Sequence, residues 1–396
     1  MGLVESRETK AQFILSFLPL TLYFPVGITN AGVLLFLLTL TCSGGYRTRL
    51  QNVRNSPIFV PVMTLLVVCC VAAVFQERSL GFWKAFLHYQ IYFFLLLFIS
   101  VGGGRWQERA IMIFLIGAMY AATVFYFEEL IGLPDWAIFQ NYIEYQGNKS
   151  ILIGILMALA CGLILNDIFS NRSGRWLRIF AFLYICAALL MYAKTRSGSV
   201  ILLLSCMIVT LRHLRFSRNG FWIVLIFALF LCVAWFIADG VRDRLLNIVH
   251  DLRAFSQGGA VSDGGVRLEL YRITLDIIQQ NPMFGSGIGN WVVQYPERAQ
   301  GLFTQNMVTP HNDYLLYTAE IGLVGLLAQL WIWMVQLVTA IRVGDDNGVR
   351  LFVFGVAIMF GAAVNAILRD ALFGMAFMIL LSIPLAGVSR QILRSR

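Results

Sequence analysis

Charged side chains are scarce in this sequence of 396 residues: Asp, Glu, Lys and Arg make up 13% of it, while 59% is hydrophobic. Soluble globular domains carry about 25% charged residues, so the composition excludes an ordinary soluble enzyme or binding module. A mean hydropathy of +0.76 leads to the same conclusion. The sequence therefore predicts an all-α, polytopic membrane protein.

Metal-binding and disulfide motifs are also missing. The seven cysteines all lie in apolar runs without CxxC or Cys/His spacing, so we interpret them as small core residues. There is no internal repeat and no separate soluble domain. The net charge of +9 does not indicate nucleic-acid binding, because the arginines punctuate apolar runs instead of gathering on one soluble face.

Apolar runs long enough for membrane-spanning helices, which need about 20 residues, fill most of the chain. We predict 12 spans, near residues 12–27, 29–43, 57–76, 80–101, 109–127, 150–166, 176–193, 198–212, 220–238, 314–341, 349–367 and 371–389. Both termini then lie on one side, and the loops on that side hold most of the Lys and Arg. By the positive-inside rule this side is cytoplasmic, so the long polar interval after span 9 lies outside, at the periplasmic face of a bacterium.

This polar interval, residues 239–313, separates spans 1–9 within residues 1–238 from spans 10–12 within residues 314–396. It is the place where we expect chemistry. Its pattern predicts two amphipathic surface helices, 241–255 and 266–280, joined by a Gly/Ser/Asp-rich connector.

The second surface helix carries two candidate cations. Arg267 and Tyr271 are four residues apart and share a face, whereas Glu269 and Arg272 can pair on another face. We expect Arg267 to contact a ligand and Arg272 to lie in an exposed salt bridge.

Glycine recurs after this helix at Gly285, Gly287 and Gly289. No strand precedes these glycines in a βαβ unit, so we reject a dinucleotide fingerprint. We expect them to permit a tight re-entry of the chain beside a bulky lipid-linked substrate.

Two further cations lie in the very short outer turn Lys194-Thr195-Arg196-Ser197, where they oppose membrane insertion. Interfacial snorkelling is one explanation. The other is an anion site at the membrane surface, which we favour because charges held near membrane depth commonly mark a substrate path.

A histidine opens the tenth predicted span in Pro310-His311-Asn312. Histidine titrates near neutrality and can take a proton from a hydroxyl group, which Arg and Lys cannot readily do. The same span carries Glu320. A carboxylate within a span is a functional candidate, which would pair with an arginine or orient its neighbours.

In their order, spacing and shared outer location, these segments resemble the bacterial O-antigen ligase and polymerase superfamily. The resemblance is densest from residue 190 to residue 330. It rests on the Thr-Arg-Ser turn and on the runs Gly265-Val266-Arg267-Leu268-Glu269-Leu270-Tyr271, Asn281-Pro282-Met283-Phe284-Gly285-Ser286-Gly287, Pro310-His311-Asn312-Asp313-Tyr314-Leu315 and Glu320-Ile321-Gly322-Leu323-Val324-Gly325.

The resemblance implies an inverting, metal-independent glycosyltransferase of lipopolysaccharide biosynthesis in the Gram-negative inner membrane, without a cofactor. Its donor would be a glycan on undecaprenyl pyrophosphate and its acceptor, in the ligase branch, a sugar hydroxyl of lipid A-core. Arg196 and Arg267 would bind the donor pyrophosphate, and His311 would activate or position the acceptor hydroxyl. Possible supporting residues are Lys194, Tyr271, Arg272, Asn312 and Glu320. Which cation of Lys194 and Arg196, and which of Arg267 and Arg272, contacts the donor stays open.

Two other functions fit parts of this pattern. An O-antigen polymerase would use the same donor and differ mainly in its acceptor. A transporter of lipid-linked sugar would use Arg196 and Arg267 for binding alone, but transporters often have two similar halves, which this sequence lacks. We expect the ligase, with the polymerase as the alternative.

Overall fold

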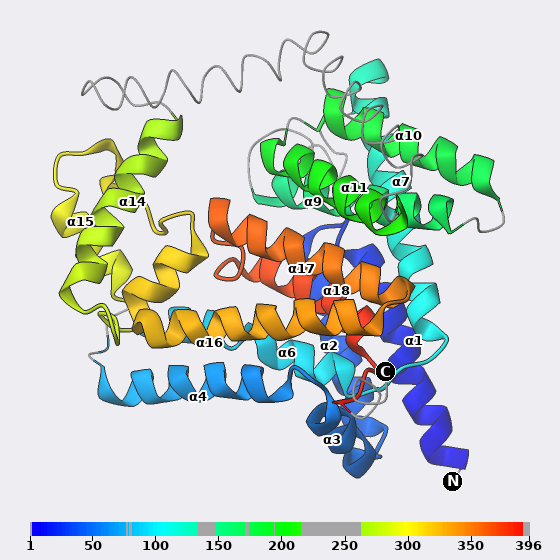
Figure 1. Ribbon diagram of the computed structural model, residues 1–396, viewed down its shortest axis with the longest axis horizontal. Helices are drawn as coiled ribbons and strands as arrows, with labels where there is room; N and C mark the ends of the chain where they lie inside the picture. Colours follow the sequence, from blue (N-terminus) through cyan, green and yellow to red (C-terminus); the bar gives the residue numbers. More distant parts are fainter. Residues whose placement is uncertain are drawn as a thin grey trace.

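The computed structural model of the chain describes residues 2–76, 78, 81–133, 148–170, 174–193, 195–214 and 263–390. Every regular element within these ranges is a helix, which confirms the predicted all-α class (Figure 1). Lys194, the predicted span 220–238 and the predicted surface helix 241–255 lie outside the described residues.

The helices correspond closely to the apolar runs and to the second surface helix. In chain order they are α1 (Gly2–Thr21), α2 (Val26–Cys42), α3 (Tyr46–Asn55), α4 (Phe59–Phe75), α5 (Phe82–Tyr89), α6 (Ile91–Ile99), α7 (Trp106–Ile131), α9 (Asn148–Phe169), α10 (Arg175–Met191), α11 (Arg196–Leu214), α14 (Asp263–Gln280), α15 (Trp291–Arg298), the 3-10 helix η1 (Phe303–Asn306), α16 (Asp313–Val343), α17 (Asp346–Val364) and α18 (Ala371–Leu385).

Five described helices are at least 18 residues long and apolar enough to cross a membrane, and the bent pair α2 and α3 would add a sixth crossing. One of the five is the continuous pair α5 and α6, and the other four are α7, α9, α16 and α17. The chain is therefore polytopic, but the predicted count of 12 spans is not confirmed. One physical reason is length, because α2, α4 and α10 each stop at 17 residues.

Helices α11 and α17 pack side by side in opposite directions. Arg212, near the end of α11, donates hydrogen bonds to the carbonyl oxygens of Gly344 and Asp345, just before α17 begins. Each helix has 19 residues and is about 28 Å long. The start of α11 therefore lies at the same end of the bundle as the end of α17.

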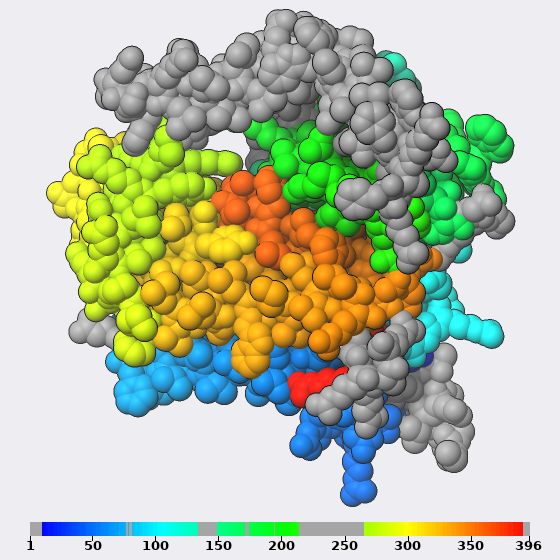
Figure 2. All heavy atoms as spheres, viewed as in Figure 1, coloured from blue at the N-terminus to red at the C-terminus, as the bar shows by residue number. Residues whose placement is uncertain are grey.

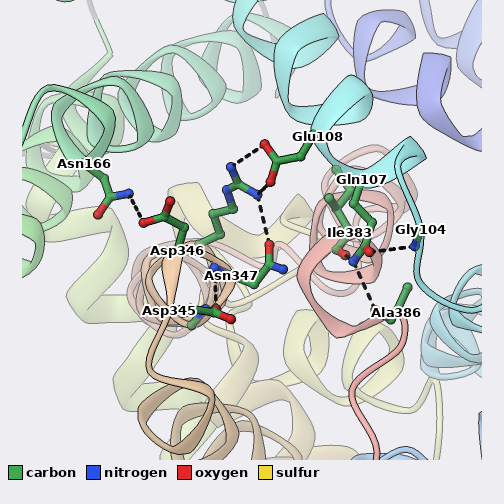
Figure 3. Close-up of polar contacts among 11 residues, drawn as sticks. Gly104, Gln107, Glu108, Asn166, Asp345, Asp346, Asn347, Ile383 and Ala386 are labelled. Atoms are coloured by element: carbon green, nitrogen blue, oxygen red, sulfur yellow. Dashed lines mark hydrogen bonds and ion pairs between the residues drawn. The ribbon is translucent and has the colours of Figure 1, made fainter. Parts of the chain in front are cut away.

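A polar cluster fixes the opposite end of the bundle, where α17 begins (Figure 3). The Arg350 guanidinium forms a two-pronged ion pair with Glu108 of α7, at 2.7 and 3.0 Å, and donates to Asn347 at 2.9 Å. Asn166 of α9 donates to Asp346 at 3.1 Å. These contacts join α7, α9 and α17 at the end that the positive-inside rule assigns to the cytoplasm.

Helix α16 is interrupted at Gly322, whose φ of 70° and ψ of −174° are not helical. The interruption frees the carbonyl oxygens of Ala319 and Glu320 from their helical partners. They accept hydrogen bonds from the backbone N–H groups of Ser286, at 2.8 Å, and Gly287, at 3.0 Å. A loop from the polar interval therefore takes the place of the missing helical turn.

The same loop satisfies the donors on the other side of the interruption. The N–H groups of Leu323 and Val324 donate to the carbonyl oxygens of Pro282, at 2.9 Å, and Met283, at 3.3 Å. A Cβ on Gly285 would lie 2.5 Å from the α16 backbone. The expected tight re-entry is thus present. Gly285 approaches α16, whose interrupted backbone groups must find partners in a membrane, and Gly289 approaches Gly81 and Phe82 at the start of α5.

We predict that Gly322→Ala destabilises the protein by about 3 kcal/mol, because an alanine there meets both a disfavoured backbone conformation and the Met283 carbonyl group. Gly301→Ala is the matched control, because Gly301 also has positive φ, at 77°, but has nothing within 4 Å. It should cost only about 1 kcal/mol. Thermal unfolding in detergent measures both variants. Equal losses would mean that the loop does not pack against α16 in this way.

Candidate active site

Asn312 joins the beginning of α16 to the end of α17. Its Oδ1 accepts from the N–H of Leu315, at 3.0 Å, which caps α16, and its Nδ2 donates to the carbonyl oxygen of Ala363, at 2.9 Å. The adjoining Asp313 carboxylate is buried and accepts from the N–H of Leu368, at 2.8 Å. Polar side chains thus satisfy the backbone groups that these helix ends leave unpaired.

His311 precedes this cap in the left-handed region, with a φ of 52°, and it is half-buried. Its Nδ1 lies 3.1 Å from the Asn365 side-chain oxygen Oδ1. That oxygen also accepts from the N–H of Ala366 at 2.9 Å, which identifies it as an acceptor. Nδ1 must therefore carry the imidazole proton. The lone pair then belongs to Nε2, as a general base requires.

Tyr271 brings α14 to the same place. Its hydroxyl group lies 3.4 Å from the Ala363 carbonyl oxygen, which Asn312 also contacts. One face of α14 packs against α15 and the beginning of α16, through a buried cluster that includes Leu270, Trp291 and Leu316 (Figure 1). This packing leaves Arg267, one turn before Tyr271 on the same face, exposed.

Arg196 is the first residue of α11 and is exposed. Because α11 and α17 are antiparallel and equally long, it lies at the end of the bundle where α17 meets His311. A cation at a helix N-terminus is unfavourable beside the positive end of the helix dipole, and a bound anion offsets that cost. The position is well suited to a phosphate group.

Glu320 lies in a separate pocket, about two turns along α16 from Asn312. Its Oε2 accepts from the Tyr89 hydroxyl group at 2.8 Å, and the side chain is 1% exposed. His88 and Arg369 line the same pocket. Glu320 Oε1, His88 Nδ1 and Arg369 Nη1 have no hydrogen-bond partner among the described residues. The free volume of about 10 Å³ suits one water molecule, which could join these atoms.

Residues 180–332 match the family model described as O-antigen ligase. This part of the chain is similar to the O-antigen ligase family. The match supports membership of the superfamily of O-antigen ligases and polymerases, and it contains Arg196, Arg267 and His311. No curated protein matches the chain.

The structure brings some of the predicted site residues together and leaves others apart. His311, Asn312 and Tyr271 converge on the end of α17. Arg196 and Arg267 are exposed on helices that reach this end, and Glu320 is not part of the convergence. Arg272 is exposed, as expected, but no ion pair joins it to Glu269 within the described part of the chain, where the buried Glu269 Oε1 has no hydrogen-bond partner.

Sequence reasoning missed Asn365, which orients His311 from outside the ligase-family match. A signal was available, because Asn365 is a polar residue that interrupts the apolar run at the end of span 11. Its distance of 54 positions from His311 concealed the connection.

We expect Asn365→Ala to lower glycan transfer roughly 10- to 100-fold, because the imidazole loses the acceptor that fixes its tautomer. Asn365→Asp keeps an acceptor oxygen and should retain most activity. Asn347→Ala is the matched control at the opposite end of α17 and should transfer normally. Initial rates over a range of acceptor concentrations measure the effect, which should fall on kcat. Loss of folding with unchanged specific activity would give Asn365 a purely structural role.

Proposed function

We propose that the protein is an inverting glycosyltransferase that moves O-antigen glycan from undecaprenyl pyrophosphate to a sugar hydroxyl of lipid A-core. The acceptor oxygen attacks the anomeric carbon as the bond from that carbon to the pyrophosphate oxygen breaks. The hydroxyl proton passes to His311 Nε2, and undecaprenyl pyrophosphate leaves as an anion. Attack from the face opposite the leaving group inverts the anomeric configuration.

The orientation of His311 carries this proposal. Its Nδ1 proton is engaged by Asn365, so the ring presents a basic nitrogen at the end of the helix bundle. General-base assistance of this kind contributes about 10²–10⁴-fold to a rate. Arg196 and Arg267 supply guanidinium groups, which stabilise negative charge as it develops on the departing pyrophosphate.

The chemistry assigned to these three side chains needs no nucleotide, metal or other cofactor, because the donor already carries an activated leaving group. The distribution of Lys and Arg supports an inner-membrane location with the site at the periplasmic face. Asn312 and Tyr271 act as positioning residues, since they hold α16 and α14 against the end of α17.

The decisive experiment is reconstitution of the purified protein with an undecaprenyl-pyrophosphate glycan and a rough lipopolysaccharide that lacks O-antigen, in the absence of nucleotide and metal. Enlarged lipopolysaccharide on a gel, lost in His311→Ala, is the expected result. Longer lipid-linked glycan without enlarged lipopolysaccharide would make the protein a polymerase. Movement of the donor across the bilayer without a new glycosidic bond would make it a transporter.

A further inference from the structure

A groove lies far from His311, at the other end of α16. It has a volume of about 320 Å³ and is lined by Pro57, Trp331, Met334, Val335, Val338, Thr339, Arg342 and Arg390. Figure 2 shows the surfaces of α16 (yellow-orange), α4 (blue) and the C-terminal segment (red) adjoining one another. The groove is independent of the site proposed for glycan transfer.

The α16 wall of the groove is one continuous stripe. Trp331, Met334, Val338 and Arg342 recur at intervals of three or four residues and therefore share a helix face. Met334 is 62% exposed and Trp331 is 42% exposed, so other helices leave this face uncovered. From Trp331 to Arg342 the stripe is about 16 Å long, which is comparable to much of a fatty-acyl chain in one leaflet of a bilayer about 30 Å thick.

Two cations complete the groove. Arg342 belongs to the last turn of α16, and Arg390 follows the end of α18. Neither side chain forms a hydrogen bond or an ion pair with any other residue that the structure describes. The groove is at the same end of the bundle as the cluster around Arg350, which the positive-inside rule assigns to the cytoplasm, so we expect both guanidinium groups at headgroup depth instead of mid-membrane.

We propose that this groove binds one anionic glycerophospholipid, with an acyl chain along the α16 stripe and the headgroup phosphate between Arg342 and Arg390. The groove combines a long apolar wall with two neighbouring arginines, as expected for a site that binds an anionic lipid. A helix-dipole role accounts for Arg342 in the last turn of α16 but not for Arg390, which lies outside that helix. Basic pockets between helix ends are a known type of anionic headgroup site.

The test compares phosphatidylglycerol with phosphatidylcholine of the same acyl chains, each titrated into the purified full chain in detergent and counted by native mass spectrometry. We expect one phosphatidylglycerol molecule to be retained at concentrations at which phosphatidylcholine is not. Each of Arg342→Gln and Arg390→Gln should weaken retention about fivefold. The matched control, Arg54→Gln with Arg105→Gln, removes the same charge outside the groove and should bind normally.

A second variant tests the apolar part without changing charge. Val338→Trp should fill the groove and abolish retention. Bromination of the phosphatidylglycerol acyl chains should quench tryptophan fluorescence less in Trp331→Phe than in the wild-type protein. Equal retention of the two lipids would overturn the proposal. Undiminished phosphatidylglycerol binding in the variant that combines Arg342→Gln with Arg390→Gln would also overturn it. A second protein copy bound in place of lipid would likewise overturn it.

Discussion

Replacement of His311 by alanine should reduce the rate of glycan transfer about 10²–10⁴-fold, which is the range that a general base contributes. Arg196 and Arg267 cannot substitute as the base, because a guanidinium group does not lose its proton in proteins. Donor binding should survive, since in the proposed mechanism His311 contacts the acceptor and not the pyrophosphate. The loss should therefore appear in kcat, with little change in the amount of donor retained.

The measurement is the initial rate of transfer in proteoliposomes, together with retention of labelled donor and thermal stability of each variant. His213→Ala provides a matched control. His213 lies near the other end of α11, 2.9 Å from Asn166 Oδ1, and stacks on Phe169. Removing that imidazole should leave transfer intact. A His311→Ala enzyme that transfers at the wild-type rate would remove His311 from the chemistry and transfer the role of base to another group.

Local sequence patterns predicted much of the fold. Proline at 282 correctly ended the second surface helix, which was expected over 266–280 and runs from Asp263 to Gln280. The span expected at 314–341 is α16, Asp313–Val343. Such features depend on neighbouring residues alone, so a single sequence is sufficient to locate them.

Other features depend on backbone geometry that hydropathy cannot register. Gly322 lies inside a run of apolar residues, and nothing in the neighbouring sequence distinguishes it from Gly325, which is helical. The loop at 281–290 supplies the hydrogen-bond partners for the backbone groups on both sides of this interruption, and these contacts are visible only in the tertiary structure. The count of 12 spans is not confirmed within the described residues, where hydropathy detects apolar residues but not the turn that shortens or bends a helix.

The candidate site shows the same division. His311 and Asn312 were accessible from the sequence because a helix start places them at the edge of a span. The side chains that contact the predicted site residues are distant in the chain: Asn365 contacts His311 across 54 positions, and Tyr89 contacts Glu320 across 231. Packing creates these pairs, so identifying them requires the tertiary structure.

The two arginines should be nearly as sensitive as the histidine. Arg196→Ala and Arg267→Ala are each expected to lower transfer roughly 10²–10³-fold, the usual consequence of removing one donor that stabilises charge in a transition state. Lysine should restore only part of the rate at either position, because an ammonium group cannot make the forked, planar contact that a guanidinium group makes with phosphate. The same initial-rate assay measures both effects.

Arg272→Ala is the informative comparison, because Arg272 is exposed on the same helix as Arg267 but is not on the Arg267–Tyr271 face. It should transfer nearly normally. If both arginines hold one pyrophosphate, the double variant should lose less activity than the product of the two single losses. A severe loss in Arg272→Ala with a mild one in Arg267→Ala would reverse the assignment. The donor would then lie on the face of α14 that carries Arg272 instead of the face that carries Arg267 and Tyr271.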